Sequence, residues 1–258
     1  MECVDVTDNI IVAIEGGWWC EKISAGCAHC YAERINQNQF FGGNQLSYLS
    51  PPPALRLRHD ILASWQRQRK KKRHFVASMT DIFGQWVPRE WHIEMLDAMV
   101  SAPKQIFMLL TKRPHIMGMA IQEWLKVADR DYLPTNIWVG CTIENQAVLI
   151  PRLSDLVQIP AHKHWIVCEP LLEKIENWGN FLSSLDLVII GGETGHNARI
   201  CDPNWISEII ANCKETHPSP AVFVKQLGSN CPLELADPKG SNPQEWPASL
   251  HVREFPDY

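Results

Sequence analysis

Three cysteines stand close together near the start of the chain, in the stretch "GGWWCEKISAGCAHCYAERI". Cys20, Cys27 and Cys30 follow the spacing C-x6-C-x2-C. A structural zinc ion takes four ligands and usually draws them from two pairs, so it would need a fourth ligand here. The nearest candidates are His29, Cys3 and His59, and none of them completes a second pair. A [4Fe-4S] cluster can instead be held by three thiolates with its fourth iron left open, so a cluster matches three cysteines better. A zinc site and cysteines without any metal are the alternatives.

The composition limits where such chemistry takes place. The chain has 258 residues, of which 45% are hydrophobic, and this is enough for a large buried core. Its net charge of −5 gives no overall attraction to nucleic acid, so any such contact would be local. Nine cysteines, an odd number, favour reduced thiols over a disulfide framework. Without a long apolar run or a basic, apolar leader, the chain is expected in the cytoplasm, with no membrane partner.

Short apolar runs recur along the chain and predict buried strands. Continuous apolar runs without alternation are typical of parallel strands that are covered on both faces. From the second run onward they recur every 25 to 35 residues. The runs are 9–14, 74–81, 105–113, 136–145, 164–172, 185–195 and 221–230.

Helical patterns lie between these runs. Asp202 and Pro203 are suited to begin a helix over 203–215, and Ile93, Leu96 and Val100 lie on one face of another. The alternation predicts an α/β fold, a partial or full (β/α) barrel of about six to seven parallel strands. A doubly wound open sheet is the alternative. The barrel is expected over 1–235, with an irregular C-terminal tail, 236–258, packed on it.

In a parallel barrel the loops after the strands converge on one mouth, so the residues there predict the site. Nearly every run ends in polar or charged residues or in glycines. They are Ser78 and Asp81, Lys112 and Arg113, Glu144, Glu169, then Gly191, Gly192 and Glu193, and finally Lys225 with Gln226. A barrel without a site would not need polar groups at so many strand ends.

The chain resembles a known family over nearly its whole length. The stretch "WWCEKISAGCAHCYAE" matches the cysteine loop of the phage-type family of radical S-adenosylmethionine-like proteins, whose function is unassigned. The likeness continues through "SMTDIF", "LLTKRP", "NIWVGCTIEN", "CEPLL", "VIIGGETG", "FVKQLG" and "WPASLHVREFP". The resemblance implies a radical S-adenosylmethionine enzyme.

The resemblance also implies roles for individual residues. Three cysteines would bind three irons of a [4Fe-4S] cluster, and S-adenosylmethionine would bind the fourth and yield a 5′-deoxyadenosyl radical. His29 would lie near the adenine. Ser78 and Asp81 follow the second strand, where the superfamily binds the methionine amino group, and are the candidates for that role. From strand-end position alone, Lys112 or Arg113 would bind the carboxylate and Glu144 the ribose. Gly191 and Gly192 would let the backbone approach the cofactor, and Glu169, Glu193 and Lys225 would act on the substrate.

Several points stay open at this stage. The association with phage-type proteins suggests a nucleotide or nucleic-acid substrate, and the reducing electron would come from an external donor such as a flavodoxin or ferredoxin. The alternative functions are a non-catalytic iron–sulfur or zinc protein and a metal-independent hydrolase that uses Glu169 and Glu193 as acid and base. The basic run 67–73 is either a solvated helix end or a nucleic-acid contact.

Overall fold

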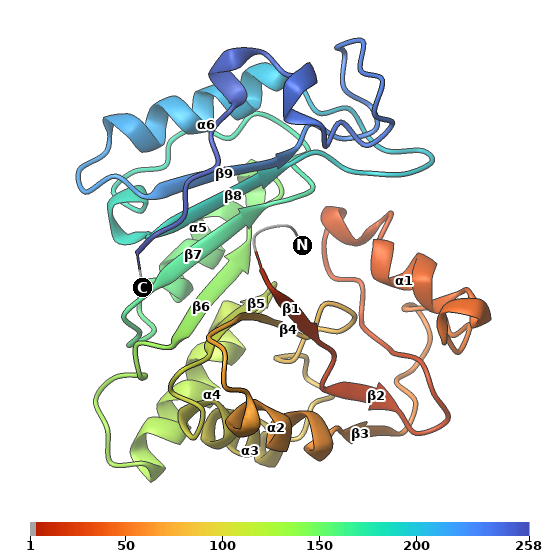
Figure 1. The fold of residues 1–258 in the computed structure, drawn as a ribbon, viewed down its shortest axis with the longest axis vertical. Helices are drawn as coiled ribbons and strands as arrows, with labels where there is room; N and C mark the ends of the chain where they lie inside the picture. Colours follow the sequence, from red (N-terminus) through yellow and green to blue (C-terminus); the bar gives the residue numbers. More distant parts are fainter. Residues whose placement is uncertain (1–3, 258) are drawn as a thin grey trace. The chain divides into compact units, whose positions relative to one another are not determined.

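The structure is a computed structural model that describes residues 4–257. Strands and helices alternate along most of the chain (Figure 1). The strands are β1 (Val6–Asp8), β2 (Ile11–Ala13), β3 (Leu55–Leu57), β4 (Arg73–Val76), β5 (Ile106–Thr111), β6 (Ile137–Thr142), β7 (His164–Cys168), β8 (Leu187–Gly191) and β9 (Ala221–Gln226). The α-helices are α1 (Tyr31–Asn36), α2 (His59–Arg67), α3 (Arg89–Val100), α4 (Pro114–Val127), α5 (Gln146–Leu156) and α6 (Pro203–Glu215).

Seven strands form one sheet in the order β1-β4-β5-β6-β7-β8-β9. The pairs β1–β4, β4–β5, β7–β8 and β8–β9 are parallel. From β4 to β9 the strands lie in the sheet in the same order as in the chain. In a doubly wound sheet, by contrast, the strand order reverses at a point within the sheet. The fold is therefore α/β with the sheet of a partial (β/α) barrel, and the doubly wound alternative is wrong.

The first apolar run does not form the first strand of this sheet. Residues 11–13 of that run form β2, which pairs antiparallel with β3 in a separate two-stranded ribbon. The edge strand is β1, where Val6 lies beside His74 of β4. The strand β1 is not predicted from the sequence because its three residues are too few to show a periodic pattern. As a result, the cysteine segment follows the ribbon rather than a strand of the main sheet.

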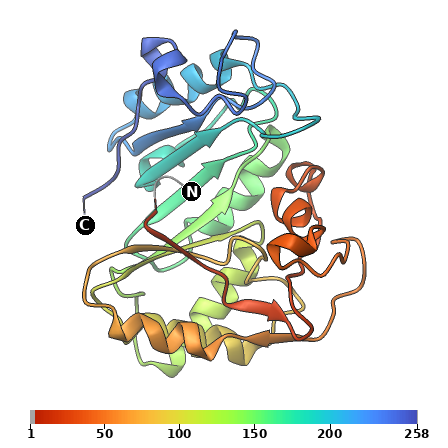
Figure 2. The ribbon, with the colours of Figure 1, turned by 45° about the vertical axis from the view of Figure 1, so that its right-hand side comes forward.

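The chain divides into two compact units. The first unit runs to Val139 and includes Gln158–His162, and the second comprises Gly140–Val157 and the chain from Lys163 onward. In the first unit, α2 packs on α3 and α3 on α4 (Figure 2). In the second unit, α6 packs on β9.

The helices bury the apolar faces that their sequences dictate. The side chain of Asp202 accepts a hydrogen bond from Asn204 N at 2.8 Å, and α6 begins there, as predicted. This helix buries Ile206, Ile209, Ile210 and Cys213. In α3 the fully buried residues are His92, Met95, Leu96 and Met99, so the face is rotated from the predicted one. His92 Nε2 donates a hydrogen bond to Ile82 O at 2.7 Å, and this bond lets a polar ring occupy the core.

The end of the chain is irregular but not separate from the sheet. Val224 N donates to Val252 O at 2.8 Å and Glu254 N donates to Val222 O at 2.8 Å, so residues 252–254 run along β9. Phe223 and Arg253 form an antiparallel bridge there. No helix in the part of the chain that the structure describes is both long and apolar enough to cross a bilayer.

Candidate functional site

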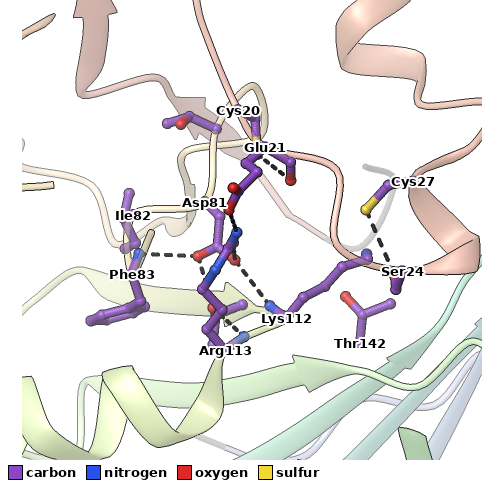
Figure 3. Close-up of polar contacts among 12 residues, drawn as sticks. Cys20, Glu21, Ser24, Cys27, Asp81, Ile82, Phe83, Lys112, Arg113 and Thr142 are labelled. Atoms are coloured by element: carbon purple, nitrogen blue, oxygen red, sulfur yellow. Dashed lines mark hydrogen bonds and ion pairs between the residues drawn. The ribbon is translucent and has the colours of Figure 1, made fainter. Parts of the chain in front are cut away.

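The cysteine segment leads from the ribbon of β2 and β3 to the start of α1. Cys27 ends a short 3-10 helix, Ala25–Cys27, and Cys30 is the residue that caps the amino end of α1. The Ser24 hydroxyl lies 3.7 Å from the Cys27 sulfur (Figure 3). All three cysteines are half-buried and free of disulfides.

Two of the three thiols pack into an aromatic pocket. Cys20 and Cys30 contact a buried cluster formed by Trp19, Ala32, Tyr48 and Met79, with Trp18 and Trp86 beside it. Trp19 and Trp86 meet edge to face with ring centroids 4.8 Å apart. This pocket excludes water from one side of the cysteine segment.

Burial in this pocket raises the pKa of the Cys20 and Cys30 thiols. The negative charge of Asp81 raises the pKa of Cys20 further, whereas a hydrogen bond from the Asp81 backbone lowers it. For Cys30, hydrogen bonds from the backbone of Glu33 and Ala32 lower the pKa. A negative charge on Cys27 would raise the pKa of both Cys20 and Cys30 further, because the sulfur of Cys27 lies near enough to interact with them electrostatically. A cation bound among them would favour the thiolates.

Asp81 joins the end of β4 to the end of β5. Its carboxylate accepts four hydrogen bonds, which come from Phe83 N at 3.0 Å, Thr111 Oγ1 at 2.7 Å, Lys112 N at 3.1 Å and Arg113 Nη1 at 3.1 Å. The side chain is buried, with 9% of its surface exposed. This carboxylate therefore holds the loops after β4 and β5 together (Figure 3).

Arg113 and Lys112 differ in what their charges contact. The Arg113 guanidinium is buried between Asp81 and Glu21, whose Oε2 lies 2.6 Å from Nη2, and it stacks over the Trp86 ring at 4.8 Å. Arg113 thus clamps the residue next to Cys20 to the end of β5. The Lys112 side chain instead extends toward Ser24 and Cys27 (Figure 3), and its charge lowers the pKa of Cys30.

The base of the cysteine segment is closed by Asn36, which is fully buried. Its Oδ1 accepts a hydrogen bond from Trp18 N at 2.9 Å, and its Nδ2 donates to Asn44 Oδ1 at 2.7 Å and to Leu46 O at 3.2 Å. Gly43 passes so close that a Cβ there would lie 2.1 Å from Asn36 O. The two ends of the segment are therefore held next to each other.

The remaining predicted cofactor residues of the first unit lie around this segment. Ser78 Oγ donates to Asn9 Oδ1 at 3.2 Å, and its carbonyl oxygen accepts from the Tyr31 hydroxyl at 2.7 Å. His29 is exposed on the segment itself. Ser78 therefore helps fix the start of α1 against the end of β4.

In the second unit, the ends of β7, β8 and β9 gather a different set. Glu169 Oε1 lies 2.5 Å from Lys225 Nζ and 2.7 Å from Gln226 Nε2. About a fifth of each charged side chain is exposed, at 19% for Glu169 and 21% for Lys225. Gly191 lies beside this group, since a Cβ there would be 3.4 Å from the Glu169 carboxyl carbon. At Gly192 a Cβ would meet Leu227 O at 2.2 Å, so only glycine fits.

The other two predicted carboxylates of the second unit turn inward. Glu144 has no exposed surface, and its Oε2 lies 2.6 Å from Arg152 Nη1. Glu193 is buried against Arg199, with Oε1 2.5 Å from Nη2, while its Oε2 accepts from Arg199 N and Nε at 2.9 Å each. Arginine neutralises both carboxylates within the same unit.

Four charged or polar residues that pair with the predicted site residues are not themselves predicted from the sequence: Glu21, Thr111, Arg152 and Arg199. A signal existed for Arg152, because it stands in the apolar stripe of α5 formed by Leu149, Leu153 and Leu156, where a charge needs a partner. Nothing in the sequence pairs Glu21 with Arg113, which is 92 positions away.

The thiols of the first unit fit an iron–sulfur cluster better than a single ion. Within residues 4–257 no three His, Cys, Asp or Glu side chains are gathered as one metal ion would require. Cluster cysteines bind different iron atoms and need not converge on one point. The buried indole N–H groups of Trp18, Trp19 and Trp86 have no acceptor in the described structure, and they belong to the pocket that holds Cys20 and Cys30. Sulfide or thiolate sulfur in that pocket would accept such bonds.

The fold and the site together define a class, namely an α/β partial-barrel protein with a three-cysteine segment beside the ends of its first strands. Residues 4–251 match DUF5131, a family described as proteins of unknown function, and the chain belongs to this family. That description names neither phage proteins nor radical chemistry, so the resemblance to both stays a prediction.

Comparisons with individual proteins add little. No curated protein matches the chain. Among solved structures, a mutant of spore photoproduct lyase is similar with a TM-score of 0.38 and 13% identity. The match covers 74% of this chain and 61% of that protein.

Proposed function

We propose that this protein is a radical S-adenosylmethionine enzyme whose [4Fe-4S] cluster is held by Cys20, Cys27 and Cys30. The observation that carries the proposal is that Cys20 and Cys30 pack on one aromatic cluster, with Cys27 on the same segment, unused indole N–H donors in the cluster and Lys112 beside it. When bound, the cluster and S-adenosylmethionine would supply a 5′-deoxyadenosyl radical, which removes hydrogen from a substrate.

The protein's own part begins with the thiols. Cys20 and Cys30 are protonated in their apolar surroundings, so each would release its Sγ proton as iron binds. The backbone N–H groups that reach Cys20 and Cys30 would then stabilise the resulting thiolates. Trp19 and Trp86 would keep water away from the same sulfurs.

Lys112 is the group proposed to bind the carboxylate of S-adenosylmethionine. Arg113 is already shared by Asp81 and Glu21, so releasing it would leave two carboxylates without their cation. The four hydrogen bonds at Asp81 likewise make it a positioning residue in this proposal. Ser78 and His29 keep their proposed places beside the cofactor.

In the second unit, Glu169 and Lys225 are proposed to contact the substrate. They form an ion pair that is partly exposed, so either group is able to exchange its partner for a polar group of the substrate. Gly191 lies beside this pair, whereas at Gly192 the missing side chain makes room for Leu227 O and not for a ligand. Glu144 and Glu193 would serve indirectly, because binding a ligand would require their arginine pairs to open.

The test is anaerobic reconstitution with iron, sulfide and a strong reductant, comparing the wild-type chain with Cys27→Ala. The wild type should take up about four iron atoms per chain and convert S-adenosylmethionine to 5′-deoxyadenosine. Cys27→Ala should lose both properties. Cys231→Ala, which removes a half-buried thiol outside the segment, is the matched control and should keep both.

Each other outcome counts against the proposal. A colourless protein with stoichiometric zinc would identify a zinc site. A loaded cluster that never yields 5′-deoxyadenosine, even with flavodoxin or ferredoxin as the electron donor, would leave a non-catalytic iron–sulfur protein. Full iron uptake by Cys27→Ala would refute the ligand assignment.

A further inference from the structure

The loop between α2 and β4 carries an unusual density of positive charge. Every residue of 67–73 except Gln68 is arginine or lysine, in a chain whose net charge is −5. Arg67, Arg69, Lys70 and Lys71 are exposed. Lys104, just before β5, is exposed as well. We call these five exposed residues the basic surface.

The backbone of this loop is held in place by one buried side chain. Gln105 has 1% of its surface exposed. Its Nε2 donates to Gln68 O and Lys70 O at 3.1 Å each, and its Oε1 accepts from Lys72 N at 3.1 Å. Because Gln105 follows Lys104, the same residue fixes both parts of the basic surface relative to each other. A solvated helix end would not need such an anchor.

Four residues of the basic surface have no ion pair within residues 4–257. Among the ion pairs of the described chain, none includes Arg67, Arg69, Lys70 or Lys104. Arg73, at the start of β4, has an acidic partner, with its Nε 3.5 Å from Asp5 Oδ2. Fixing several like charges close together costs free energy, so an anionic partner would bind favourably.

The basic surface lies away from the thiols. Arg73 begins β4 and Ile106 begins β5, whereas Asp81 and Lys112 follow the far ends of these strands. Six residues of β5 span roughly 20 Å at about 3.3 Å per residue. A partner bound at the basic surface would therefore be held at the end of the strands opposite to the proposed chemistry.

We propose that the basic surface binds the phosphodiester backbone of a nucleic acid. Arginine guanidinium groups match phosphate oxygens in geometry, and lysines add point charges along the same loop. The run contains no apolar side chain that would insert into a lipid layer, which distinguishes it from an amphipathic membrane anchor. Binding would be insensitive to base sequence and sensitive to salt.

The test uses the full chain without cluster or cofactor, so its result does not depend on the proposed function. Fluorescence anisotropy would measure binding of a labelled single-stranded oligonucleotide of about 16 nucleotides. The wild type should bind, and the quadruple variant R67Q/R69Q/K70Q/K104Q should bind at least about tenfold more weakly. Between roughly 50 and 200 mM salt, the slope of log affinity against log salt should shrink by about 3.

A matched control removes the same charge elsewhere. The variant K126Q/R130Q/K214Q/K239Q changes four exposed basic residues outside the loop and should retain both affinity and slope. Equal losses in the two variants would overturn the proposal, since net charge alone would then explain binding. Failure of the wild type to bind, or tighter binding to phosphatidylserine vesicles than to the oligonucleotide, would overturn it too. Circular dichroism of both variants checks that they fold.

Discussion

The two units differ in how the charged side chains at their strand ends are paired. In the second unit, each carboxylate that was predicted as a site residue pairs with a cation of its own: Glu144 with Arg152, Glu193 with Arg199 and Glu169 with Lys225. In the first unit, Asp81 and Glu21 share Arg113, and Lys112 extends toward the cysteine segment instead. A polar residue at a strand end therefore either completes the fold or, in the function proposed above, meets a ligand.

Exposure separates these two uses. The pairs Glu144–Arg152 and Asp81–Arg113 are buried, and breaking either one strands a charge in the interior. The pair Glu169–Lys225 is partly exposed, so water compensates for much of its loss. The free energy of unfolding should consequently rank the variants in the order of burial.

The largest effect is expected at Arg152. Arg152→Met would leave Glu144 charged and fully buried and remove the hydrogen bond to Thr142 O, so the free energy of unfolding should fall by about 3 to 5 kcal/mol. Urea denaturation followed by circular dichroism measures this change. The double variant Glu144→Leu with Arg152→Met should recover most of the loss. A double variant as unstable as the single one would show that the ion pair is not the cause.

The next effect is expected at Asp81. Asp81→Asn would keep the shape of the side chain but remove the charge that pairs with Arg113, at a cost of about 2 kcal/mol. The loops after β4 and β5 would lose their shared acceptor, so iron uptake during reconstitution should also fall. Wild-type iron uptake by a folded Asp81→Asn chain would contradict the positioning role.

A smaller effect on stability is expected at Glu169. Glu169→Gln should change the free energy of unfolding by about 1 kcal/mol or less, because its pair with Lys225 is partly exposed. If the pair contacts the substrate, substrate turnover should drop by about a hundredfold once a substrate is found. Until then, formation of 5′-deoxyadenosine without substrate should be unchanged, and its loss would place Glu169 at the cofactor instead.

The smallest effect on stability is expected at Lys112. Lys112→Gln should alter the free energy of unfolding by only about 0.5 kcal/mol, as surface substitutions do. The affinity for S-adenosylmethionine should nevertheless fall about tenfold, measured by calorimetry on the reconstituted protein. Lys112→Arg keeps the charge and should keep most of the affinity. Equal losses in both variants would exclude a simple charge contact.

The parts of the fold that could be predicted are those written in local patterns. The six later apolar runs became β4 to β9, and Asp202 with Pro203 begins α6 where expected. The edge strand β1 was missed because its three residues carry no period, while the longer run beside it looked like a strand of the sheet. A local sequence pattern predicts the length and periodicity of a strand, but it does not predict which other strand it pairs with.

The candidate site shows the same division. Strand-end position correctly indicated that Asp81, Lys112 and Arg113 would gather, and likewise Glu169 and Lys225. Strand-end position could not indicate that Arg113 forms an ion pair with Glu21 or that Glu144 forms one with Arg152. The partner of a charged side chain depends on tertiary packing, which the sequence pattern does not show. Three-dimensional contacts are needed to distinguish a charged side chain held in a buried ion pair from one that is able to bind a ligand.

The bond from Trp18 N to Asn36 Oδ1 joins residues eighteen positions apart and closes the segment between them into a ring. Closing a flexible loop of that length costs roughly 2 to 3 kcal/mol of conformational entropy. Within this ring, the thiols of the proposed cluster site have little conformational freedom left to lose when a ligand binds.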